Sequence, residues 1–257
     1  MRRERGPLAA ALASVGSFLV EPVEPPAGVA STPPPAAVAR PVVTVFGLAP
    51  GCGSTVVARA VATALGARDP AGAATVTSEG RAALPPLGTG AATRLARLVA
   101  EFPGADARAT GRLCVVRGVD PLALADGARH LAPVVLDAGS SLGGVHAALP
   151  DHLLLVTTPR LEPALARVAA ECLARVGPEP RIVVNRVAGL AGLAGLAGLA
   201  GTASMAPGAG LADVAGSLAD AVFLPEARLA AQLALRGREP PGELGRVIAS
   251  LAAELAM

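Results

Sequence analysis

The sequence predicts a doubly wound α/β domain with a mainly parallel β-sheet. Short runs of Val and Leu alternate with segments of helical periodicity from about residue 41 onward, as in successive βαβ units. The runs at 134–137 and 153–157 are apolar until their last residue, which indicates strands that are buried on both faces. With 257 residues, 52% of them hydrophobic and 16% charged, the chain is long enough to bury one sizeable core.

The expected strands are short apolar runs that end at a turn or at a polar residue. Valine is frequent in them, and branched side chains pack well on a pleated, buried surface. In chain order, the expected strands cover residues 42–47, 73–77, 113–117, 134–137, 153–157, 181–187 and 221–224.

The expected helices lie between these strands, where apolar residues recur every three or four positions. In chain order, they cover residues 55–65, 91–100, 121–130, 163–176, 226–235 and 244–255. The helix at 163–176 has the clearest apolar stripe, which we expect to be buried and which comprises Leu165, Val168, Ala169, Cys172, Leu173 and Val176. Cys172 is therefore expected to pack in the core, with Arg167 and Glu171 on the opposite face, where their spacing permits pairing.

Two low-complexity segments are expected outside the core. Residues 1–40 start with a basic and then an apolar stretch, and seven prolines follow within 21–41, so we expect a flexible segment with an extended linker. Residues 189–201 repeat Gly-Leu-Ala with a period of three, which neither a strand nor a helix face buries, and we interpret them as an insertion in a connection. The apolar stretch at 7–20 is too short to span a bilayer, and contact with a membrane stays open.

The composition excludes several classes of function. All 22 basic residues are arginine, so Schiff-base chemistry and any phosphate site that depends on a lysine are excluded. Aromatic residues make up only 2% of the chain and the net charge is +2, so we expect no sequence-specific binding of nucleic acid. Cys52, Cys114 and Cys172 are widely spaced and odd in number, which favours neither disulfides nor zinc and fits a reducing cytoplasm.

The segment at 46–60 is a glycine-rich turn between a buried strand and a helix. Such a turn directs backbone N–H groups and the helix N-terminus at one point, which makes it a candidate anion site. Gly51 and Gly53 allow a close approach to the backbone, and the Thr55 hydroxyl is placed to hold a magnesium ion. Asp137, at the carboxyl end of a buried strand, is expected beside this site.

The order of these motifs resembles the deviant Walker A family of P-loop NTPases, the ParA/MinD group that includes pilus-localisation proteins of the CpaE/TadZ type. The loop APGCGSTVVA at 49–58 matches at the two glycines, the threonine and the last alanine. VVLDAGSS at 134–141 is similar to the Walker B strand, and LLLVTTP at 153–159 to the strand that ends in T-x-P. IVVNRV at 182–187 and FLPEARLAAQLALRGREP at 223–240, which is similar to the family's C-terminal proline-turn-helix, complete a likeness that extends over about 41–257.

The resemblance implies a P-loop domain at 41–257 that binds ATP or ADP with Mg²⁺. It implies that Asn185 contacts the base, and that Thr55 and Asp137 hold the metal directly or through water. The nucleotide-binding residues that it implies are Gly51, Cys52, Gly53, Ser54, Thr55, Val56, Asn185, Arg186 and Pro225. A protein partner and a nucleotide-dependent homodimer are further expectations.

The departures from the family pattern concern charge. Both lysines of the family loop are replaced, by Ala49 and Ser54, and Arg59 and Arg81 are the arginines that could swing in. Because cations dominate phosphoryl-transfer catalysis, we expect hydrolysis to be slow or absent, and we assign no catalytic residue. The expected function is a degenerate ParA/MinD-like ATPase or nucleotide-binding switch that helps to position a pilus, septum or chromosome.

The sequence is also compatible with other functions. One is a catalytically inactive scaffold that keeps the fold for protein contacts. Another is a dinucleotide-binding protein, with Gly51 and Gly53 in the first turn and Glu79 at the ribose. The G-x-S-x-G pattern at 139–143 resembles a hydrolase nucleophile elbow, but no histidine follows His152 to complete a triad.

Overall fold

The computed structural model describes the fold from Arg40 to Met257 with several gaps. The described residues are 40–77, 90, 92–118, 120–140, 150–161, 163–187 and 221–257. The expectations for 1–39 and for the repeat at 189–201 therefore fall outside the described residues, as do those for Glu79, Arg81 and most of the 139–143 pattern.

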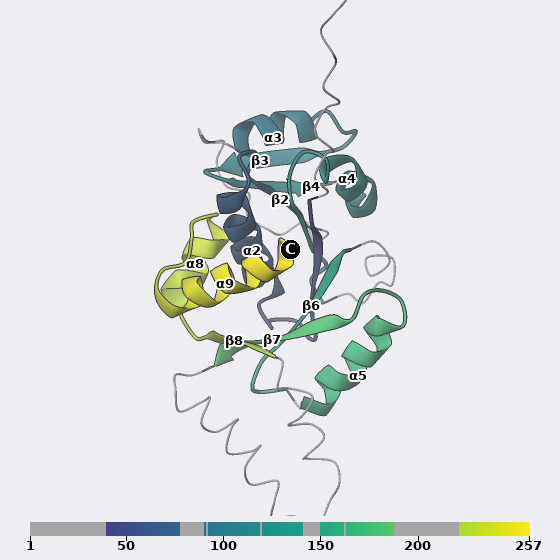
Figure 1. The fold of residues 1–257 in the computed structure, drawn as a ribbon, viewed down its shortest axis with the longest axis vertical. Coiled ribbons are helices and arrows are strands. Elements are labelled where there is room, and N and C mark those ends of the chain that lie inside the picture. The colour runs from purple at the N-terminus through teal and green to yellow at the C-terminus, as the bar shows by residue number, and fades with distance from the viewer. Residues whose placement is uncertain are drawn as a thin grey trace, which may run out of the picture. The chain divides into compact units, whose positions relative to one another are not determined.

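A β-sheet of eight strands runs through the described part of the chain (Figure 1). Its order is β3-β4-β2-β5-β1-β6-β7-β8, and every neighbouring pair is parallel except β3 and β4. The strands are β1 (Val42–Gly47), β2 (Ala73–Thr77), β3 (Asp106–Thr110), β4 (Leu113–Arg117), β5 (Val134–Asp137), β6 (His152–Thr157), β7 (Pro180–Val187) and β8 (Val222–Pro225). The predicted mainly parallel sheet is confirmed.

Helices cover both faces of the sheet, so the predicted doubly wound architecture is also confirmed (Figure 1). One face carries α2 (Ser54–Arg68), α8 (Arg228–Leu235) and α9 (Gly242–Leu255), and the other carries α3 (Ala92–Val99), α4 (Pro121–Ala128) and α5 (Pro163–Ala174). Side chains of β5 alternate between the two faces of the sheet. Val135 packs in the core under α2, whereas Val134 and Leu136 pack in the core under α3 and α4.

Helix α2 is the most deeply buried helix of the described fold. It packs against the sheet on one side and against α8 and α9 on the other, and its buried face is mainly Ala and Val. A Cβ added at Gly66 would lie 2.7 Å from the Arg112 carbonyl oxygen, so this helix approaches the sheet too closely for a larger residue there. Among the described residues, no helix is both long and apolar enough to cross a membrane.

The start of β1 is held by charged side chains. Arg40 donates from Nε to Asp69 Oδ2 at 2.5 Å and from Nη1 to the His130 carbonyl oxygen at 2.7 Å. Asp151 Oδ2 accepts from the Val42 N–H at 2.8 Å. These bonds fix the position at which the chain enters the sheet.

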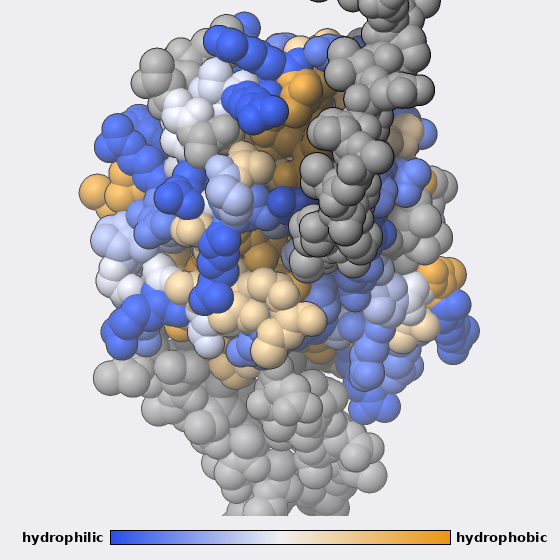
Figure 2. Space-filling view, turned by 45° about the horizontal axis from the view of Figure 1, so that its top comes forward, coloured by the Kyte–Doolittle hydropathy of each residue, from blue (hydrophilic) through white to orange (hydrophobic). Residues whose placement is uncertain are grey.

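The surface of the described fold is rich in arginine. Figure 2 shows one face on which hydrophilic side chains surround smaller apolar areas. Ion pairs include Arg117 with Asp106 at 2.6 Å, and Arg167 with Glu171 at 3.0 Å on α5, as the spacing predicted. Exposed pairs of this kind contribute little stability, so the buried sheet and its helices hold the fold together.

Strand β3 is absent from the sequence-based predictions. Its five residues, DARAT, are polar or small, and only Ala109 is fully buried. The strand forms an antiparallel hairpin with β4 through Gly111 and Arg112, and Gly111 adopts φ 56°. As an edge strand it needs no apolar run, because hairpin pairing with β4 supplies its backbone partners.

The predicted buried stripe of α5 is partly wrong. Ala169 and Leu173 are buried as expected, but Leu165, Val168 and Val176 are 54%, 57% and 50% exposed, and Cys172 is also exposed. The helix packs through Ala166, Ala169 and Leu173 instead. Small alanines let the helix lie close to the sheet, which turns the larger apolar side chains outward.

The repeat at 189–201 should be dispensable for folding. Strands β7 and β8 are adjacent and parallel, so a crossover of about a dozen residues must join them. Replacing 189–201 by a short Gly-Ser link leaves residue 188 and 202–221 for that purpose, and loop length costs little closure entropy. We expect the free energy of unfolding in urea to change by no more than about 1 kcal/mol. Loss of cooperative unfolding or of solubility would show that the repeat packs as a helix.

Candidate functional site

The candidate site lies at the carboxyl edge of the sheet, where the parallel strands end. The loop at 48–53 leaves β1 between its neighbours β5 and β6. The Gly47 N–H donates to the Gly139 carbonyl oxygen at 2.6 Å, and the Leu48 N–H donates to the Val156 carbonyl oxygen at 2.8 Å. The start of the loop is therefore fixed on both sides, by the segment that follows β5 and by β6 itself.

The loop itself is a tight turn with two left-handed glycines. Gly51 adopts φ 82° and Gly53 adopts φ 87°, which side chains rarely allow. The Cys52 N–H donates to the Ala49 carbonyl oxygen at 3.2 Å, and Cys52 Sγ accepts from the Ala49 N–H at 3.3 Å. The Cys52 side chain is 3% exposed and belongs to the core, so it anchors the loop from below.

The N-terminus of α2 opens directly from this loop. Its N-cap is Gly53, no side chain caps its backbone, and its first turn contains no acidic residue. The first N–H groups of a helix have no partner within the helix and carry partial positive charge. An uncapped N-terminus next to a glycine turn is therefore suited to bind an anion.

Asn185 joins the end of β7 to the loop. Its Nδ2 donates to the Cys52 carbonyl oxygen at 2.8 Å, and its Oδ1 accepts from the Arg186 N–H at 2.9 Å. Because C=O and N–H point in opposite directions in a trans peptide, this bond directs the Gly53 N–H away from Asn185. The sequence predicted Asn185 at a base, and the structure places its amide against the loop backbone.

The metal candidates lie on either side of the loop. Thr55 is the second residue of α2, and Asp137 ends β5 opposite Val45 in register. Asp137 is 3% exposed, and its Oδ1 accepts from the Gly139 N–H at 3.2 Å. Ser54 is also buried, and its Oγ would lie 3.2 Å from a Cβ added at Gly47. A hydroxyl and a carboxylate are the hard oxygen donors that suit Mg²⁺.

Arg59, an arginine that could replace the loop lysine, contacts the end of α8. Its Nη1 donates to the Leu235 carbonyl oxygen at the end of α8, at 2.6 Å, and the residue is 3% exposed. Burial lowers the pKa of the Arg59 guanidinium from its ordinary value, while attraction to the Asp137 carboxylate acts in the opposite direction. The Arg59 side chain thus joins α2 to α8, and a role for it as a cation at the loop stays a prediction.

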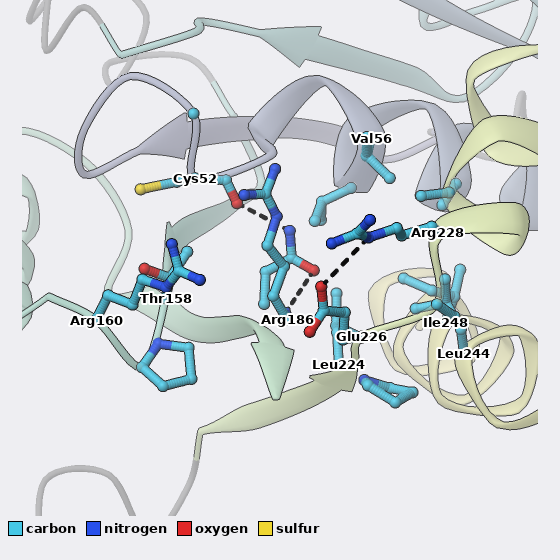
Figure 3. A pocket seen from close by; sticks show the side chains of 18 of the residues that line it. Cys52, Val56, Thr158, Arg160, Arg186, Leu224, Glu226, Arg228, Leu244 and Ile248 are labelled. Atoms are coloured by element: carbon cyan, nitrogen blue, oxygen red, sulfur yellow. Dashed lines mark hydrogen bonds and ion pairs between the residues drawn. The ribbon is translucent and has the colours of Figure 1, made fainter. Parts of the chain in front are cut away.

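A cavity of about 880 Å³ opens beside the loop (Figure 3). Its apolar wall is formed by side chains of α2 and α9 and the end of β8, among them Val56, Leu224 and Ile248. The predicted site residues that line it are Gly51, Cys52, Val56, Asn185, Arg186 and Pro225. Gly53, Ser54, Thr55 and Asp137 are not among the residues that line it, although Cys52 and Val56 on either side of the first three are.

Sequence reasoning missed the charged residues of the cavity. Arg160, Arg228 and Glu226 line it together with Arg186. Arg228 Nε lies 3.7 Å from Glu226 Oε1, and the Arg228 side chain is 91% exposed. Arg160 directly follows the T-T-P segment, and Glu226 follows Pro225, so their places in these motifs were the available signal.

Comparisons with solved structures all point to one type of fold. No protein-family model and no curated protein matches the chain. Among solved structures, MinD of Aquifex aeolicus matches with a TM-score of 0.55 at 14% identity, covering 84% of this chain and 96% of that one. MinD of Pyrococcus horikoshii complexed with Mg-ADP gives 0.53 at 16%, covering 84% and 95%, and a ParA family ATPase of Chlorobium tepidum gives 0.51 at 17%, covering 84% and 98%. The chain therefore has the ParA/MinD type of fold.

Its strand order differs from the 3-2-1-4-5-6 order of dinucleotide-binding folds, because β5 lies between β1 and β2.

Gly53 should tolerate substitution much less well than Gly51. Both have a positive φ, but a Cβ at Gly53 would lie 2.4 Å from Asn185 Nδ2, whereas one at Gly51 would have no atom within 4 Å. Gly51→Ala carries only the backbone cost, about 1–2 kcal/mol, and we expect Gly53→Ala to lose at least about 1 kcal/mol more. The free energy of unfolding in urea measures both.

The same pair of variants tests the contact with Asn185. Removing the amide with Asn185→Ala should make room for the new methyl group and recover part of the extra loss at Gly53, but nothing at Gly51. Equal losses for the two glycine variants would show that the contact between Gly53 and Asn185 does not constrain the loop.

Proposed function

We propose that this chain is a ParA/MinD-like nucleotide-binding switch that takes ATP or ADP with Mg²⁺ and helps to position a cellular assembly such as a pilus, septum or chromosome. The observation that carries the proposal is the left-handed glycine loop that opens on the uncapped N-terminus of α2 beside a cavity. Solved structures of the same fold include a MinD complexed with Mg-ADP and a plasmid partition protein of Borrelia burgdorferi bound to AMPPNP.

The site offers separate environments for the parts of a nucleotide. Backbone N–H groups of the loop and of α2 suit the phosphates, whose charge the helix N-terminus favours. The cavity of about 880 Å³ is of the size that small-molecule sites have, and Val56, Leu224 and Ile248 give it an apolar wall for a base. Thr55 and Asp137 would hold Mg²⁺, which when bound offsets phosphate charge.

Binding is favoured over hydrolysis at this site. Ala49 and Ser54 stand at the two lysine positions of the family loop, and Arg59 is held at the Leu235 carbonyl oxygen. Phosphoryl transfer relies on cations placed around the transferring group, so their loss slows the reaction more than it weakens binding to backbone N–H groups. We therefore infer a degenerate ATPase, in effect a pseudo-ATPase of the CpaE-like kind.

A protein partner is part of the proposal. Leu165 and Val168 on α5 and Val176 just after its end expose half or more of their surface, and neighbouring exposed apolar side chains favour a protein contact. A solved complex of the same fold pairs MinD with MinC, and we infer a protein partner or a nucleotide-dependent homodimer here. This observation also supports the second candidate, a scaffold that binds proteins without nucleotide.

Free thiols support a reducing compartment, and we infer a cytoplasmic location. Cys52, Cys114 and Cys172 are all unpaired. Burial raises the pKa of the Cys114 thiol to about 12, so this side chain stays protonated and unreactive at neutral pH.

Removal of the Thr55 hydroxyl should weaken binding of MgATP. We expect Thr55→Ala to lower the affinity about tenfold, since a hydroxyl ligand of the metal is lost, whereas Thr55→Ser keeps the hydroxyl and should bind as the unchanged chain does. Calorimetric titration measures both, and with EDTA the difference should vanish. If the unchanged chain shows neither heat nor a thermal shift with millimolar MgATP, the switch is excluded in favour of the scaffold.

A lysine restored at position 54 should tighten nucleotide binding. Ser54 occupies the lysine position at the start of α2, and Ser54→Lys places a cation next to the phosphate-binding backbone. We expect about tenfold tighter binding of MgATP, with Ser54→Gln as a control of similar length without charge. An unchanged affinity in a folded lysine variant would mean that the loop does not cradle phosphate.

A further inference from the structure

Arg186 has an unusual backbone conformation. Its φ is 63°, and it is the one non-glycine residue with positive φ among the described residues. Side chains rarely adopt this left-handed region, and an arginine gains nothing from it locally. Such outliers persist where the surrounding structure imposes them, and they gather at binding sites.

The structure around Arg186 imposes this conformation. The pairing of β7 with β8 shifts register between Val184 and Val187, so Arg186 lies in an irregularity of the sheet edge. Bulges of this kind redirect a side chain away from the alternation of the strand. The Arg186 N–H is also held by Asn185 Oδ1 at 2.9 Å, while Asn185 Nδ2 bonds to the loop at Cys52.

The side chain of Arg186 is directed at the loop. Figure 3 shows its guanidinium beside Cys52, in the cavity that both residues line. Because Asn185 holds the end of β7 against the Cys52 carbonyl oxygen, the next residue is brought to the loop by the same contact. The bond between Asn185 and Cys52 therefore fixes where Arg186 lies relative to the loop.

Of the other cations of the cavity, Arg228 faces Glu226 at 3.7 Å. Figure 3 shows Arg160 next to Thr158, on the Cys52 side of the cavity, and unlike Arg186 it follows no residue that is hydrogen-bonded to the loop. Among the described residues, no carboxylate forms an ion pair with Arg186. Its positive charge is therefore available for an anion bound at the loop.

We propose that Arg186 is the cation that binds the nucleotide phosphates in place of the missing loop lysines. The inference rests on the proposed nucleotide binding and deepens it, because it names the residue that supplies the charge. A guanidinium is planar and always protonated, and it binds phosphate oxygens through two parallel N–H bonds. The guanidinium at the end of β7 would thus bind the phosphates from outside the loop. The family's lysine at the start of α2 binds them from within it.

The experiment compares Arg186→Gly, Arg186→Lys and the unchanged chain in titrations with MgATP and with adenosine. Glycine adopts a positive φ at no steric cost, so Arg186→Gly should melt no lower than the unchanged chain. We expect it to lose at least about tenfold in affinity for MgATP but less than about twofold for adenosine. Arg186→Lys keeps the charge and should recover most of the loss. Arg94→Ala, on the exposed side of α3, is the matched control for lost charge and should change neither affinity.

The outcomes separate this inference from the proposed function. If the unchanged chain binds MgATP and Arg186→Gly binds it equally well, the role of Arg186 is excluded while nucleotide binding stands. An equal loss for adenosine would assign Arg186 to the base, and a lysine variant as weak as the glycine variant would exclude a role of charge. If the unchanged chain binds no MgATP, the proposed function itself fails.

Discussion

The hydrogen bond from Asn185 Nδ2 to the Cys52 carbonyl oxygen holds the candidate site together. It joins residues 133 positions apart, one in the loop after β1 and one at the end of β7. Breaking it would leave a carbonyl group without its partner beside the core, at a cost of about 1–3 kcal/mol if water does not replace the amide. The close approach of Asn185 to the loop also explains why residue 53 is a glycine, since the Cβ of any other residue there would lie 2.4 Å from Asn185 Nδ2.

The site shows how a fold of the P-loop type can dispense with lysine. Its backbone features, the left-handed glycines and the uncapped helix, need no particular side chain and are all present. The charge, by contrast, must come from side chains, and the arginines at the cavity come from β7, from the segment after β6 and from the start of α8. Backbone N–H groups suffice for binding an anion, whereas transfer of a phosphoryl group needs cations on the moving charge, and this difference underlies the proposal of a switch.

Most of the secondary structure could be predicted because each buried strand carries its own signal. Runs such as VVTVFG are mostly apolar and are buried throughout, since both faces of β1 are covered by helices. Strand β3 escaped prediction because its partner is supplied by a hairpin rather than by an apolar face. The buried side of α5 was misjudged because periodicity weights large side chains, while the actual contact with the sheet is made by Ala166, Ala169 and Leu173.

By itself, the sequence determined the order of the strands and helices other than β3, the glycines of the loop, and the absence of every lysine from the site. These features depend on residue type and on neighbours a few positions away. The tertiary structure alone decided that Asn185 lies against Gly53, that Arg59 binds the end of α8, and that Arg186 points at the loop. Each of these contacts joins segments remote in the chain, and a side chain of arginine is long and flexible enough that only the packing around it selects its direction.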